Sequence, residues 1–135
     1  MSEPDATFRS SFAADRTAPS IARHAISEFL HTHGADPRAL ADVLLALSEV
    51  VTNSVVHGYR NQDGGEVAIE AKQWAGRLML SVADRGGGMA PRHDSPGLGL
   101  GLSLVGRIAQ RVDITAPSGG GTLVSMCFTL DQPAA

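Results

Sequence analysis

Residues 46–59 read ALSEVVTNSVVHGY, and this segment gives the first indication of both fold and function. It continues an apolar pattern that predicts one helix from about residue 37 to 57. At about 100° per residue, Glu49 and Asn53 lie on one side of this helix, one turn apart. The opposite side carries a continuous apolar stripe made of Leu40, Leu44, Leu47, Val51 and Val55. An acid and an amide on one helix face, together with the glycine-rich segments at 84–89 and 97–105, indicate a site, because a purely structural helix has no use for that set.

The chain before this helix predicts a weak first strand at 6–14 and an amphipathic helix at 18–33. Asp36 is positioned to cap the helix that contains Glu49, with Pro37 at its first position.

The chain after this helix alternates in the way that strands do. We expect a strand at 66–73, a hairpin turn at Ala75 and Gly76, and a second strand through Leu78, Leu80 and Val82. A third helix at about 101–110 precedes a strand that starts at Val112, and a last strand carries four inward residues, Val124, Met126, Phe128 and Leu130. Strands and helices do not alternate regularly. The pattern therefore predicts one α/β two-layer sandwich over 1–135, with a mixed, mostly antiparallel sheet covered by about three helices on one face.

The composition limits the classes of function. The chain has 135 residues, 43% hydrophobic residues and a net charge of −3, so the basic surface typical of nucleic-acid binding is absent. No run of about 18 apolar residues predicts a membrane span. The single cysteine, Cys127, allows no internal disulfide, and we expect a reducing, cytoplasmic setting.

The second candidate segment is DRGGGM, residues 84–89. Asp84 has the same strand parity as Leu78, Leu80 and Val82, so it extends an inward row and points into a cleft. There it can accept a hydrogen bond from an exocyclic amine such as that of adenine, while Gly86 and Gly88 let the backbone pass close to a flat ring. The alternative is a strand that simply ends in an Asp-Gly turn.

The third candidate segment is GLGLGLSLV, residues 97–105, in which Gly97, Gly99 and Gly101 precede the predicted helix. Glycines at a helix start expose backbone N–H groups to an anion, although a flexible hinge would also use them. The segment matches neither the Walker P-loop nor the Rossmann fingerprint. Thr122 follows three glycines and either adds a hydroxyl to the base pocket or only begins a strand.

The helix residues complete this set. The amide oxygen of Asn53 can ligate magnesium, which prefers oxygen donors and bridges phosphates, and Glu49 can accept a proton from an attacking hydroxyl or water. Otherwise they are a surface acid and a helix-end amide. The five histidines show no metal-ligand spacing. His57 either borders the site or packs, and Arg92 either reaches a phosphate or is solvated.

In this order, the segments resemble those of the Bergerat-fold ATPase superfamily of gyrase, histidine kinases and MutL-type proteins. LSEVVTNSVVHGY is similar to the N-box of bacterial anti-sigma-factor serine-protein kinases. DRGGGM, GLGLGLSLV and GGGT resemble the three glycine boxes of that family, and SFAADRTAPSIARHAISEFL resembles its first strand and helix. The likeness covers most of the chain.

The resemblance implies a Bergerat α/β sandwich that binds ATP with Mg²⁺. It implies that Glu49 is the catalytic base, that Asn53 holds the metal and that Asp84 binds adenine. The nucleotide-binding residues it implies are Asn53, Asp84, Gly86, Gly88, Met89, Gly97, Gly99, Leu100, Gly101, Leu102 and Thr122. In the family, the substrate serine lies on a STAS-domain anti-anti-sigma protein, and the kinase also sequesters a sigma factor, usually as a homodimer.

Three other functions stay open. The chain could be a regulator whose affinity for a protein partner depends on the bound nucleotide, with little or no phosphotransfer. It could activate a phosphatase module, or it could be a structural domain without nucleotide. Glu49 favours catalysis, because a protein that only holds a nucleotide needs no base.

Overall fold

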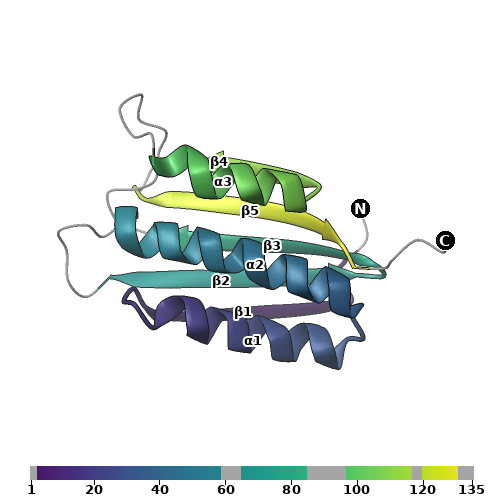
Figure 1. The fold of residues 1–135 in the computed structure, drawn as a ribbon. Helices are drawn as coiled ribbons and strands as arrows, with labels where there is room; N and C mark the ends of the chain where they lie inside the picture. The colour runs from purple at the N-terminus through teal and green to yellow at the C-terminus, as the bar shows by residue number, and fades with distance from the viewer. Residues whose placement is uncertain (1–2, 59–64, 85–96, 117–119, 131–135) are drawn as a thin grey trace.

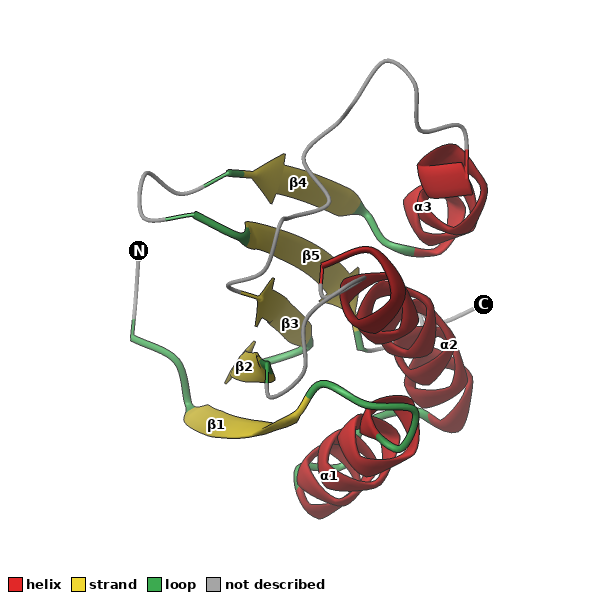
Figure 2. Cartoon of the chain, turned by 90° about the vertical axis from the view of Figure 1, so that its left-hand side faces the viewer, coloured by secondary structure: helices red, strands yellow, loops and turns green. Residues whose placement is uncertain are grey.

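The computed structural model describes residues 3–58, 65–84, 97–116 and 120–130. Its elements in chain order are β1 Ala6–Ala13, α1 Ala18–Thr32, α2 Pro37–Asn53, the π-helix η1 Ser54–Gly58, β2 Glu66–Trp74, β3 Arg77–Asp84, α3 Gly97–Ile108, β4 Arg111–Thr115 and β5 Thr122–Thr129. The three α-helices lie on one side of the sheet, as Figures 1 and 2 show. The predicted two-layer sandwich is confirmed.

The five strands form one sheet in the order β1-β2-β3-β5-β4. Every strand pair in the described part of the chain is antiparallel, so the expectation of a mixed sheet was wrong. The β2–β3 hairpin turns at Gly76, whose φ of 71° suits a residue without a Cβ. β5 then joins the sheet beside β3, and this pairing brings together residues that are between 38 (Asp84 and Thr122) and 52 (Arg77 and Thr129) positions apart in sequence.

The start of α2 follows the sequence signal. The Asp36 side chain accepts hydrogen bonds from the backbone N–H groups of Arg38 at 3.0 Å and Ala39 at 3.4 Å. Pro37 takes the first helical position, where its missing N–H costs nothing.

The buried face of α2 is rotated from the predicted stripe. Leu47 and Val51 are fully buried as expected, but Leu40, Leu44 and Val55 are only half-buried. The residues that fill the core instead are Ala39, Val43, Ala46 and Val50. By length and composition alone, Pro37–Val56 could span a membrane; in the fold its buried face covers the sheet, which explains the apolar content.

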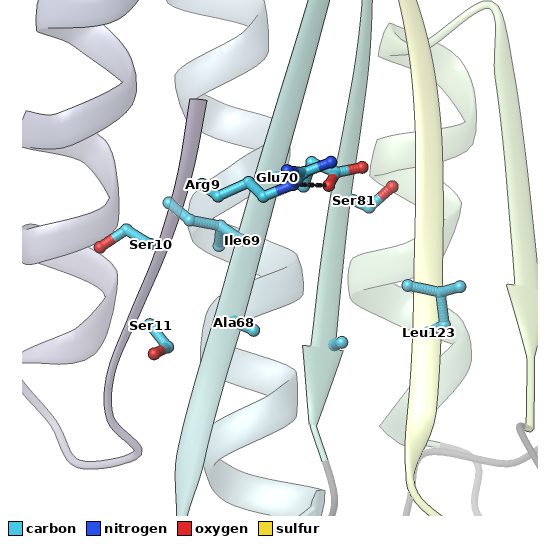
Figure 3. Close-up of a pocket in the computed structure, with 9 residues that line it drawn as sticks. Arg9, Ser10, Ser11, Ala68, Ile69, Glu70, Ser81 and Leu123 are labelled. Carbon is cyan, nitrogen blue, oxygen red and sulfur yellow. Dashed lines mark hydrogen bonds and ion pairs between the residues drawn. The ribbon is translucent and has the colours of Figure 1, made fainter. Parts of the chain in front are cut away.

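Within the described residues, no helix covers the other face of the sheet (Figure 2). Between β1, β2, β3 and β5 it forms an open hollow of about 500 Å³, seen in Figure 3. Arg9 and its cross-strand partner Glu70 form an ion pair in the lining of this hollow, and Ser81 lies beside them. None of the candidate site residues lines it.

Candidate functional site

Two of the predicted site residues meet at one end of the core. Along β3, the inward residues are Leu78, Leu80 and Val82, and the row ends in Asp84, which is 4% exposed. Thr122 begins the inward row of β5, is 1% exposed and is the direct cross-strand partner of Asp84. The prediction that Asp84 extends an inward row is confirmed. The pairing places a carboxylate and a hydroxyl side by side under the helix layer.

Asn53 lies at the edge of the buried face of α2, and not opposite that face as the sequence pattern suggested. It is half-buried, and its Nδ2 is buried with no hydrogen-bond partner among the described residues. The rotation of α2 described above explains the difference, because it moves the centre of the buried face towards Asn53. An unsatisfied buried amide N–H costs about 1–3 kcal/mol, so the group is suited to a partner outside the protein.

Glu49 lies one turn before Asn53 and is half-buried. On one side of it, Ala46 and Val50 are fully buried. On the other, Leu45 and Val56 are 45% and 52% exposed. The carboxylate therefore stands at the boundary between core and surface, where an external hydroxyl can reach it.

The predicted single helix over 37–57 changes its winding at this point. It is α-helical to Asn53 and continues as the π-helix η1, which contacts β3. Single π-turns within α-helices are rare and occur frequently at functional sites. Ser54, the first residue of η1, lies on the buried side with 0% exposure and is not among the predicted site residues. Its spacing from Leu47 and Val50 was the available signal.

The second glycine segment lies inside α3. This helix begins at Gly97, about four residues earlier than predicted, so Gly97, Gly99, Leu100, Gly101 and Leu102 occupy its first two turns. The expectation that the glycines precede the helix was wrong, because glycine weakens a helix without forbidding it. The first turn still has N–H groups without helical partners, which favour an anion. It lies at the same end of the fold as the end of α2 and the start of β5 (Figure 1).

The remaining predicted residues are Gly86, Gly88, Met89 and Arg92, and they lie outside the described residues. No group of three or more His, Cys, Asp or Glu side chains that could hold a metal occurs within the described ranges.

Residues 12–128 match the family of histidine kinase-like ATPase domains. The chain belongs to this family. Among similar proteins is the anti-sigma F factor of Clostridium beijerinckii, 30% identical over 84% of this chain and 87% of the relative. The anti-sigma F factor of Clostridium kluyveri is 31% identical over 90% and 93% of the two chains.

A solved structure also resembles this histidine kinase-like ATPase domain. It contains the RsbU and RsbW domains of Rv1364c from Mycobacterium tuberculosis, with a TM-score of 0.72 and 28% identity. The match covers 97% of this chain and 34% of that one, so the chain spans about a third of the larger protein. The fold is thus that of an α/β Bergerat-type ATPase domain, and membership of this family implies that the chain binds ATP.

Proposed function

We propose that the chain is an ATP-dependent serine-protein kinase that phosphorylates a STAS-type anti-anti-sigma protein and sequesters a sigma factor. The observation that carries the proposal is the position of Glu49, a half-buried acid on α2 one turn before Asn53. The C-terminal end of α2 lies at the same end of the fold as the end of β3, where Asp84 is the last residue (Figure 1). The named anti-sigma F factors and the RsbW domain support the regulatory part. A homodimer in the cytoplasm is the form in which we expect it to act.

The residues at this end of the core would contact different parts of the bound nucleotide. Asp84 accepts a hydrogen bond from the exocyclic amine of adenine, and the Thr122 hydroxyl lies beside it. The N–H groups at the start of α3 face phosphate oxygens. Asn53 would hold Mg²⁺ through its amide oxygen, and the ion would neutralise charge on the phosphates. The Nδ2 group of Asn53, which has no partner among the described residues, could then donate a hydrogen bond to a phosphate oxygen.

Glu49 is then the general base. It accepts the proton of the substrate serine hydroxyl as the serine oxygen attacks the γ-phosphorus of ATP. The bond from that phosphorus to the bridging oxygen breaks, and ADP leaves. Leu45 on α2 and Val56 on η1 are exposed, so this helix presents apolar side chains that a protein substrate could contact.

The test is transfer of labelled phosphate from Mg·ATP to STAS-domain proteins of the same organism, by wild type and Glu49→Ala. Loss of a general base lowers turnover about 10²- to 10⁴-fold, while ATP affinity should stay unchanged. Glu28→Ala is the matched control, because Glu28 is a solvent-exposed acid on α1. Transfer by Glu49→Ala at the wild-type rate would refute the base assignment.

Failure of transfer by the wild type has a different meaning. If it binds Mg·ATP and labels no partner, the function changes to a regulator whose hold on a sigma factor depends on nucleotide. Size-exclusion chromatography with a sigma factor, with and without ATP, then separates that function from a domain that binds neither.

A further inference from the structure

The hydroxyl of Ser54 is buried without a hydrogen-bond partner among the described residues. Two other helical hydroxyls bond the carbonyl four residues back: Thr32 donates to Glu28 O and Ser48 to Leu44 O, both at 2.8 Å. Ser54 makes no such bond. An unpaired buried hydroxyl costs about 1–3 kcal/mol. Its presence in the core therefore indicates that a bound ligand or an ordered water provides its hydrogen-bond partner.

The position of Ser54 shows where that group would be. Leu47, Val50 and Ser54 follow one another along the buried side of α2 and η1. The inward row of β3 ends in Asp84, and that of β5 begins with Thr122. Three apolar rows from three elements therefore each finish in a buried polar side chain. Asp84 and Thr122 are cross-strand partners, and η1 contacts β3, so the three polar ends lie at the same end of the core (Figures 1 and 2).

We propose that Ser54 is a base-recognition residue of the nucleotide site. Its hydroxyl donates a hydrogen bond, directly or through one ordered water, to the adenine ring nitrogen next to the exocyclic amine. This inference rests on the proposed function of Asp84 at the same edge of the base. A carboxylate that accepts and a hydroxyl that donates match the amine and ring nitrogen of adenine. On guanine, the corresponding edge presents an oxygen and an N–H group, the reverse of this pattern.

The test compares wild type and Ser54→Ala in calorimetric titrations with Mg·ATP and with 1-deaza-ATP, in which that ring nitrogen is a C–H group. We expect Ser54→Ala to weaken ATP roughly threefold to tenfold, the value of one net hydrogen bond. It should change 1-deaza-ATP little, because the bond is already absent there. Ser81→Ala is the control: it removes a hydroxyl 3.3 Å from Ser125 Oγ on the opposite face of the sheet.

Each outcome decides the matter. Unchanged ATP affinity of Ser54→Ala, or equal losses for both nucleotides, overturns the base contact. Thermal unfolding without nucleotide gives a second readout: the variant should be at least as stable as wild type, since an unsatisfied hydroxyl is removed. A less stable variant would assign the hydroxyl to the fold and also overturn the inference. A wild type that binds no ATP would instead remove the proposed function itself.

Discussion

Replacement of Asp84 by asparagine tests base recognition most directly. Asparagine has nearly the same size, so the packing at the end of β3 is kept, but the charge is lost and one acceptor becomes a donor. A hydrogen bond to a charged acceptor contributes about 1.5–3 kcal/mol, which corresponds to a roughly tenfold to 150-fold weaker Kd. We expect the upper half of this range, because Asp84 is 4% exposed and water screens it little.

The assay is isothermal titration of wild type and Asp84→Asn with ATP and with tripolyphosphate, both with Mg²⁺. Only ATP carries the base, so its affinity should fall by the full factor while tripolyphosphate binds as before. Asp113→Asn is the matched control, because Asp113 is an exposed carboxylate bonded to Arg111 on β4. Equal losses for both ligands would refute the reasoning, since they would show that Asp84 acts on the fold or the phosphates.

Three further changes have expected outcomes. Asn53→Ala should give the same ATP Kd with Mg²⁺ and with EDTA; a retained difference would remove its metal role. Asp36→Ala should lower the free energy of unfolding by about 1 kcal/mol in urea titrations, with Asp36→Ser recovering most of it; no change would show that the cap contributes nothing. The hydrogen bond from Arg9, with the charge of Lys72, holds the pKa of Glu70 below its usual range. The stabilisation by this ion pair is present above about pH 4.3 and is lost as the pH falls through the lower pKa of Glu70 in the folded state. Glu70→Gln should therefore lower the free energy of unfolding at pH 7 by at most about 1 kcal/mol, because the pair is partly exposed. In urea unfolding this difference from wild type should shrink from pH 7 towards pH 3. A deficit independent of pH would contradict the ion-pair explanation.

Local rules predicted much of the site. The period of two along β3 placed Asp84 on the inward face, and the structure buries it there. The spacing of four placed Glu49 and Asn53 one turn apart. The Asp36 cap followed from one polar residue before a proline. Each of these three predictions depends only on the geometry of a single helix or strand, which a few neighbouring residues determine.

Other features depended on what each element packs against. The apolar residues of α2 occupy more than half of its circumference, so the sequence could not say which part would face the sheet. The structure buries Val43 and Val50 and leaves Leu44 half-buried. The position of Asn53 at the edge of the core follows from that choice. The start of α3 at Gly97 was likewise missed, because the low helix propensity of glycine is a weak signal for where a helix begins.

The sequence by itself determined the two layers, the inward aspartate and the paired acid and amide, because periodicity and capping act over a few residues. Tertiary structure decided that Thr122 lies beside Asp84, since this requires β5 to pair with β3 across about 40 residues of chain. It also decided that Ser54 is fully buried: helical spacing from Leu47 and Val50 directs this residue towards the core, and the contact of η1 with β3 forms only in the assembled layers. Burial and long-range pairing are properties of the assembled layers, and no short stretch of sequence contains them.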